Sequence, residues 1–139
     1  MPEAPGSVIP YLTVKGAKAA IAFYEKVFGA KETFRMPAED GERLLHARLT
    51  LGTGLLMLSD DFPETCTGTA APAAGAEVNV AIALALAAAA DVDATHDAAV
   101  AAGAVSETAP QDMFWGDRFA SVRDPFGHRW MLSAPKAQG

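Results

Sequence analysis

The chain has 139 residues, half of them hydrophobic and a fifth charged, and its formal net charge is −6. This length favours one domain with a real core, and the composition is typical of a globular protein and not of a disordered one. An acidic chain without clusters of Lys or Arg is a poor candidate for nucleic-acid binding.

The sequence also argues against a membrane or secreted protein. Its longest apolar run, residues 80–90, is rich in Ala and has 11 residues, which is too short to span a bilayer. No secretory signal is visible. Cys66 stands alone, cannot form an internal disulfide and fits a reducing compartment. We therefore expect a cytoplasmic protein with no membrane partner, and Cys66 as an unreactive loop residue.

The first half of the chain predicts a strand, a helix and three strands. Residues 7–14 have a β-rich alternating pattern. Residues 17–29 place apolar side chains at helical spacing, and Gly29 favours the end of that helix. Three further strands joined by tight turns are expected at 30–37, 43–51 and 55–59.

A loop rich in Pro, Thr, Gly and Ala follows at 60–76, and the same order of elements then recurs. Residues 77–85 predict a strand. Residues 91–103 predict a helix that starts with Asp residues and ends at Gly103. The last three strands are expected at 104–110, 117–123 and 128–133, with a turn at 124–127.

The two halves match at an offset of 74 residues. Gly103 follows Gly29 by this number, and Met131 follows Met57 by the same number. One structural unit is therefore predicted to occur twice. We expect a single domain over 1–139, with modules at 7–59 and 77–134 joined by the linker 60–76.

Alternation along the strands predicts which side chains share a face. Because neighbours in a strand point to opposite faces, each helix is expected to cover the more apolar face of its module. The side chains expected under the two helices are Pro10, Leu12, Val14, Leu56, Leu58, Val80, Ile82, Leu84, Trp130 and Leu132. The opposite faces mix polar groups with small or soft ones, as ligand cavities do. They carry Ile9, Tyr11, Thr13, His46, Arg48, Thr50, Leu55, Met57, Ser59, Asn79, Ala81, Ala83, Arg129, Met131 and Ser133.

Three stretches carry a resemblance to a known superfamily: AIAFYEKVFGA, DVDATHDAAVAAGA and FWGDRFASVRDPFGHRWML. Together they resemble the vicinal oxygen chelate superfamily, which includes glyoxalase I, extradiol dioxygenases, fosfomycin-resistance enzymes and bleomycin-resistance proteins. The last stretch is most similar to the PhnB-like branch of uncharacterised bacterial proteins. The resemblance implies an α+β fold of two βαβββ modules that form a curved mixed sheet around a cavity, in a chain that usually pairs as a homodimer.

The resemblance also implies four places for metal ligands. Enzymes of this superfamily hold a divalent metal with His, Gln and Glu from four cavity strands, and these places fall here on Ile9, Met57, Asn79 and Met131. None of the four is a convincing ligand for zinc, iron or manganese, and two thioethers suit only Cu(I). We therefore expect no metal and no cofactor at this place. A divalent metal held elsewhere with His46 is the alternative.

Several residues are candidates for the site, and for each of them a purely structural role is the alternative. Met57 and Met131 suit an apolar or aromatic guest, or they merely fill space. His46 is the candidate catalytic residue, as a general base or an anchor for an anion, or else it is a strand histidine bonded to a neighbour. Trp115, beside Phe114, covers the cavity as a lid or packs at an edge or dimer contact. The ligand-binding candidates are Tyr11, Arg48, Met57, Asn79, Trp115 and Met131.

The preferred function is reversible, metal-free binding of a small apolar or aromatic molecule, similar to the bleomycin-resistance branch. The acidic net charge is compatible with a cationic ligand. The alternatives are a metal-dependent lyase, isomerase or dioxygenase of the same superfamily, a metal-free catalyst that uses His46, and an interaction module without a ligand. The expected partners are a small-molecule ligand and a second copy of the chain.

Overall fold

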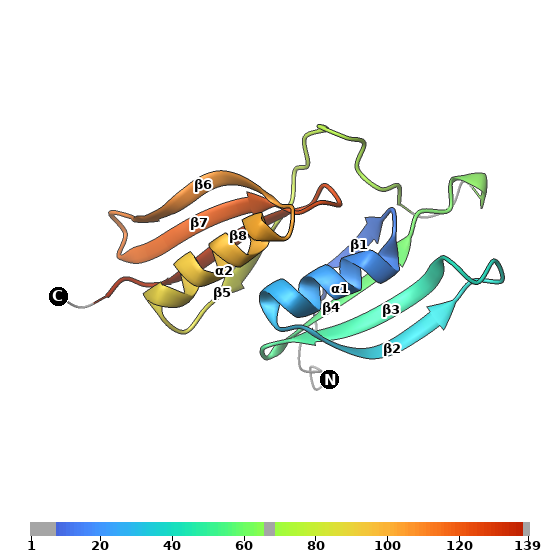
Figure 1. Ribbon diagram of the computed structural model, residues 1–139, viewed down its shortest axis with the longest axis horizontal. Coiled ribbons are helices and arrows are strands. Elements are labelled where there is room, and N and C mark those ends of the chain that lie inside the picture. The colour runs from blue at the N-terminus through green and yellow to red at the C-terminus, as the bar shows by residue number, and fades with distance from the viewer. Residues whose placement is uncertain (1–7, 66–68, 138–139) are drawn as a thin grey trace. The chain divides into compact units, whose positions relative to one another are not determined.

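The computed structural model describes residues 8–65 and 69–137, and the chain divides into two compact units, Met1–Ala73 and Ala74–Gly139. Each unit holds one α-helix and one sheet of four strands (Figure 1). None of the helices in the described stretches is long and apolar enough to cross a membrane. Cys66 lies outside the described residues.

The first unit has the predicted order of elements. Its elements are β1 (Tyr11–Val14), α1 (Ala17–Phe28), β2 (Lys31–Pro37), β3 (Leu44–Leu51), β4 (Gly54–Asp60) and the short 3-10 helix η1 (Pro63–Thr65). The strands lie in the order β1-β4-β3-β2, with β1 parallel to β4 and the other pairs antiparallel.

The second unit repeats this topology. Its elements are β5 (Ala81–Ala85), α2 (Ala89–Ala101), β6 (Val105–Asp112), β7 (Asp117–Arg123) and β8 (Arg129–Pro135). The strands lie in the order β5-β8-β7-β6, again with one parallel pair, β5 with β8. The α+β fold of two repeated βαβββ modules is therefore confirmed.

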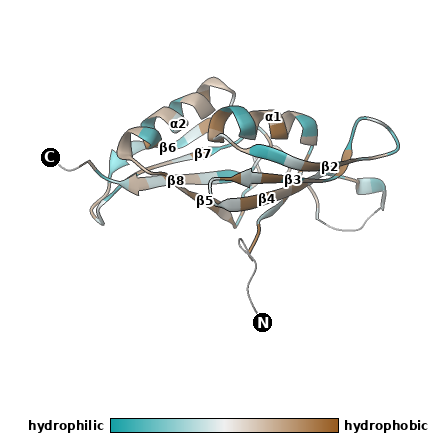
Figure 2. Ribbon diagram, turned by 90° about the horizontal axis from the view of Figure 1, so that it is seen from below, coloured by the Kyte–Doolittle hydropathy of each residue, from teal (hydrophilic) through white to brown (hydrophobic). Residues whose placement is uncertain are grey.

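Each helix covers one face of its own sheet, as Figure 2 shows for α1 and α2. Leu12 and Val14 in β1, and Leu58 in β4, are buried on the α1 side, as alternation predicts. Trp130 and Leu132 in β8 are fully buried on the α2 side. The opposite face of each sheet is not covered by the helix of its unit, and we call it the open face.

Several boundaries differ from prediction where the residues carry little signal. The strand predicted from residue 7 begins at Tyr11, and the strand predicted from residue 77 begins at Ala81. The helix predicted from residue 91 begins at Ala89, because Ala is a good helix former that also occurs in strands. Val80, expected under the helix, is 71% exposed. The remaining ends differ by one or two residues.

The two units do not match at one constant offset. Tyr11 pairs with Met57 and Ala83 pairs with Met131, so the first strands match at an offset of 72 residues and the last strands at 74. The difference arises because α2 and the connection that follows it are each one residue longer than α1 and the connection that follows α1. Asn79, which lies before β5, is therefore not the counterpart of Ile9, and the predicted position of Asn79 in the fifth strand is wrong.

One buried carboxylate joins three elements of the first unit. Asp60, at the end of β4, is 4% exposed. Its Oδ1 accepts hydrogen bonds from the N–H groups of Gly16 at 2.8 Å and Ala17 at 3.0 Å, where α1 begins. Its Oδ2 accepts one from the N–H of Leu44 at 2.8 Å, where β3 begins. A carboxylate here satisfies free N–H groups at the positive end of the helix dipole, where Gly16 has no side chain to do so.

Replacing Asp60 by Asn tests the contribution of these three hydrogen bonds. Asn keeps the size of the side chain but has one accepting oxygen, so its NH2 group opposes an N–H that Asp60 satisfies. Because hydrogen bonds to charged groups contribute about 1.5–3 kcal/mol each, we expect the free energy of unfolding, measured in urea, to fall by about 2–3 kcal/mol. Asp61→Asn is the matched control, since the Asp61 carboxylate accepts one hydrogen bond, from the backbone N–H of Ala71. Equal losses in the two variants would contradict the assignment.

Candidate functional site

A β-bulge in β3 decides which side chains reach the open face of the first sheet. His46 lies opposite Met36, but Leu44 lies opposite Pro37, so Leu45 is an extra residue without a partner in β2. Leu44 is fully buried, whereas Leu45 is 48% exposed. Bulges re-aim side chains in this way and are frequent beside functional sites.

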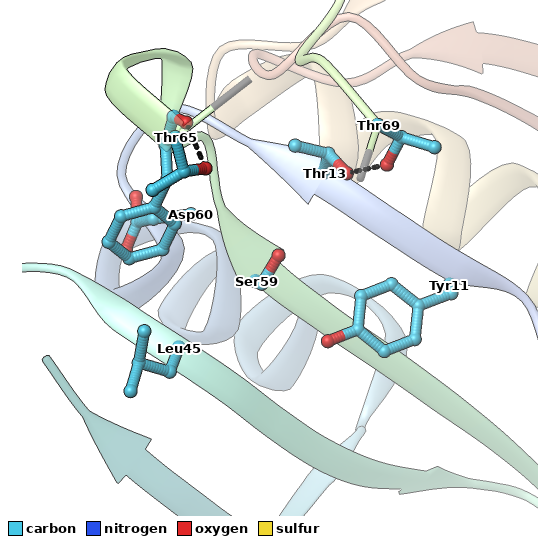
Figure 3. A pocket seen from close by; sticks show the side chains of 8 residues that line it. Tyr11, Thr13, Leu45, Ser59, Asp60, Thr65 and Thr69 are labelled. Atoms are coloured by element: carbon cyan, nitrogen blue, oxygen red, sulfur yellow. Dashed lines mark hydrogen bonds between the residues drawn. The ribbon is translucent and has the colours of Figure 1, made fainter. Parts of the chain in front are cut away.

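A pocket of about 500 Å³ lies beside this bulge of β3 (Figure 3). Its walls come from β1, β3, β4 and the segment after β4: Tyr11, Thr13, Leu45, Ser59, Asp60, Phe62, Thr65 and Thr69. The walls therefore combine aromatic and leucine surface with five hydroxyl groups. Such a mixture of apolar walls and a few polar groups is typical of small-molecule sites.

The hydroxyl groups in the pocket differ in what they already bind. Thr13 is hydrogen-bonded to Thr69, and the hydroxyl of Thr65 donates to the carbonyl oxygen of Phe62 at 2.9 Å. Ser59 lies between Leu45 and Tyr11 in Figure 3. Within the described ranges its hydroxyl makes no hydrogen bond, so Ser59 is the hydroxyl that remains available to a guest.

Tyr11 joins the pocket to His46. The hydroxyl of Tyr11 and Nδ1 of His46 are 2.8 Å apart, and the two rings stack with their centroids 5.5 Å apart. The ring of Phe34 lies 6.0 Å from that of His46. When the imidazole is neutral and carries its proton on Nε2, Nδ1 accepts a hydrogen bond from the Tyr11 hydroxyl, which fixes the orientation of the ring.

The register places four side chains in one row across the open face of the first sheet. Tyr11 pairs with Met57, Met57 with Arg48, and Arg48 with Phe34. Residues paired directly across neighbouring strands point to the same face, so all four belong to the open side. The structure therefore brings together Tyr11, Met57 and Arg48 of the predicted ligand-binding residues, with His46 beside them.

The other three predicted ligand-binding residues belong to the second unit. Met131 is 37% exposed and lies on the open face of β8, where its partners in register are Ala83 and Ser121. Trp115 lies in the turn between β6 and β7, and its ring contacts those of two phenylalanines edge to face. Asn79 is exposed ahead of β5. The contacts found among the described residues do not join these three into one cluster.

The residues at the four metal places implied by the resemblance do not fit a divalent ion. Ile9, Met57 and Met131 offer no oxygen or imidazole donor, and Asn79 offers only a neutral amide oxygen. His46 has no suitable companions either, because no three His, Cys, Asp or Glu side chains in the described ranges lie close enough to hold a metal ion.

Part of the pocket was not predicted. Thr13 and Ser59 lie on the open face, as alternation predicts. Strict alternation from His46 would put Leu45 on the opposite face, and the bulge brings it to the open face instead. The sequence predicts only a linker at 60–76, yet this stretch supplies Phe62 and two threonines to the pocket. Phe62 was the available signal, as an aromatic residue in a loop of otherwise small residues.

Phe62 is held in place by Arg43. The guanidinium carbon of Arg43 lies 4.3 Å from the centre of the Phe62 ring, a favourable cation–π distance. The same guanidinium donates to Glu64 at 2.6 Å and to Asp40 at 2.7 Å. The backbone N–H of Arg43, followed by its guanidinium, holds the pKa of Asp40 at about 2, and the guanidinium also lowers the pKa of Glu64.

A carboxyl NMR titration tests this arrangement at Asp40. Its depressed pKa means that the carboxylate stabilises the fold above the ordinary value of 3.8, and that this contribution is lost as the pH falls toward about 2. In Arg43→Gln we expect the midpoint to rise part of the way to 3.8, because the backbone N–H of residue 43 remains. Arg35→Gln is the control and should leave the midpoint unchanged. An ordinary midpoint in the unaltered protein would refute the contact.

Comparison with known proteins supports a single family. The model of the Glyoxalase/Bleomycin resistance protein/Dioxygenase superfamily matches residues 7–132. An uncharacterised protein of Mycobacterium bovis is 43% identical over 126 residues, which are 91% of this chain and 81% of that protein.

Two solved structures share the fold. Protein PA1353 from Pseudomonas aeruginosa superposes with a TM-score of 0.75 at 24% identity, over 94% of this chain and 98% of that chain. A PhnB protein from Bacillus cereus, described as a putative 3-demethylubiquinone-9 3-methyltransferase, superposes with a TM-score of 0.71 at 15% identity, over 91% and 98%. With the family model spanning most of its length, the chain belongs to the Glyoxalase/Bleomycin resistance protein/Dioxygenase superfamily.

Proposed function

We propose that the first unit binds a small, partly aromatic or apolar molecule reversibly and without a metal. The observation that carries this proposal is the pocket of about 500 Å³ beside Tyr11, Leu45 and Phe62. Its volume falls within the range of small-molecule sites, which is roughly 300–1,000 Å³. The family also includes bleomycin resistance proteins, and this is compatible with a binding function.

The side chains support a planar guest in particular. Tyr11 and Phe62 offer aromatic surfaces on which a ring can stack, and Met57 in the neighbouring row adapts its shape to a partner. Ser59 offers a hydroxyl that can donate or accept one hydrogen bond. The lack of suitable donors at the implied metal places supports a function without a metal.

A second candidate function is proton transfer by His46 without a metal. The 2.8 Å contact between Nδ1 and the Tyr11 hydroxyl favours it, because a held imidazole can present Nε2 to a substrate as a general acid or base. Loss of turnover in His46→Ala with ligand binding retained would distinguish this enzyme from a binding protein. The homodimer, and the alternative function as a metal-dependent enzyme, remain predictions.

Filling the pocket tests the binding function. We use 2-naphthol as a planar neutral probe and measure its affinity by fluorescence titration. Ser59→Leu places a larger side chain between Leu45 and Tyr11, and we expect the affinity to fall at least about tenfold, or about 1.4 kcal/mol.

Ser133→Leu is the matched control, because Ser133 lies on β8 in the second unit at the place that Ser59 has on β4. This variant should leave the affinity unchanged. The proposal fails if 2-naphthol shows no saturable binding, or if both variants weaken it equally.

A further inference from the structure

The arginines of this chain are almost all ion-paired. Five of them lie within 4.0 Å of a carboxylate oxygen: Arg35, Arg43, Arg118, Arg123 and Arg129. Arg48 has no carboxylate at that distance among residues 8–65 and 69–137, and its side chain is exposed. It is therefore a guanidinium whose charge the described part of the chain leaves uncompensated.

The open face around Arg48 carries positive groups and no carboxylate from its four strands. Lys31 lies opposite Thr50 and shares this face with Arg48 and the titratable His46. Glu32 lies opposite the buried Leu49 and so belongs to the α1 side. Asp60 is buried, and both its oxygens accept backbone hydrogen bonds. In a chain with a net charge of −6 this face is a local exception.

The acidic groups that flank the pocket are also engaged. Asp40 and Glu64 both bind the guanidinium of Arg43. Asp61 accepts a hydrogen bond from the N–H of Ala71 at 2.9 Å. None of the three therefore supplies the missing partner of Arg48.

The second sheet shows what a compensated open face looks like. Arg129 in β8 binds Glu107 at 2.5 Å and Glu77 at 3.4 Å, and Arg123 in β7 lies 3.5 Å from Glu107. The Arg129 guanidinium lowers the pKa of Glu107, so this carboxylate stays ionised and the charges cancel. The register places Ser121 where the first sheet has Arg48, since each pairs with the methionine of the neighbouring strand.

We propose that the molecule bound by the first unit is a small planar aromatic carboxylate, held through its anionic group by Arg48. This inference rests on the proposed function and specifies the class of its ligand. A guanidinium offers parallel N–H donors that match the two oxygens of a carboxylate. The acidic net charge of the chain is compatible with a cationic ligand, but the positive groups on this face do not favour one.

The row of side chains sets how such a ligand lies. Neighbouring strands are about 4.8 Å apart, so the backbone positions of Tyr11 and Arg48 are separated by roughly 10 Å with Met57 between them. The side chain of Tyr11 reaches across β4 to His46, so a fused ring in the pocket that stacks on Tyr11 extends past Met57 toward Arg48. Its carboxylate then meets Arg48 at the other end.

Three probes with one ring system test the charge of the ligand. We compare 2-naphthoate, 2-naphthol and 2-naphthylmethylammonium, which carry a negative, a neutral and a positive group, by fluorescence titration at low salt. The unaltered protein is expected to bind naphthoate at least about tenfold more tightly than naphthol, and the ammonium compound most weakly.

Arg48→Gln is expected to abolish the preference, so that naphthoate and naphthol bind with equal affinity. Arg35→Gln, which removes an exposed arginine paired with Glu32 on the α1 side, is the matched control and should keep the preference.

The outcomes separate this inference from the proposed function. Binding of naphthol without a preference for naphthoate, or a preference that survives in Arg48→Gln, overturns the anion inference and leaves the binding function standing. Failure of all three probes to bind overturns the proposed function and the inference with it. If Arg48→Gln lowers the mass measured by sedimentation and leaves naphthoate binding intact, Arg48 contacts a second copy of the chain and the inference is wrong.

Discussion

The carboxylate of Asp60 accepts hydrogen bonds from three backbone N–H groups, and these groups belong to two different regions of the first unit. Two of them fix the start of α1 directly after β1, and the third holds β3 where its bulge begins. The position of α1 decides which face of the sheet is covered. The bulge decides that Leu45 and His46 reach the face that is left open, so the pocket depends on this buried group.

The second unit repeats the fold but not the site. Ala83 stands where the first unit has Tyr11, and Ser121 stands where it has Arg48. Arg129, on the same open face, is neutralised by glutamates. Only the first unit therefore combines an aromatic wall with an unpaired guanidinium among the described residues. The two units therefore share a topology and an apolar buried face, while the chemistry of their open faces differs.

How far the sequence predicts this structure depends on how local each determinant is. Alternation and helical spacing are local, so the buried sides of β1, β4 and β8 and the helix end at Gly29 could be predicted. The contacts of Asp60 join residues up to 44 positions apart, and no local pattern reveals them. The bulge at Leu45 depends on pairing with β2, which alternation ignores. Asn79 was misplaced because the alanine-rich segment after it resembles strand and helix equally.

The central claim is that the open face of the first sheet is the ligand site, and methionine methyl groups can report on it directly. With 13C-labelled methionine methyls, Met57 and Met36 report on the first sheet and Met131 on the second. An aromatic ring shifts the resonance of a methyl that it covers, so saturating 2-naphthoate is predicted to move Met57 most, Met36 less, and Met131 not at all. A saturable shift of Met131 with Met57 unmoved would contradict the account.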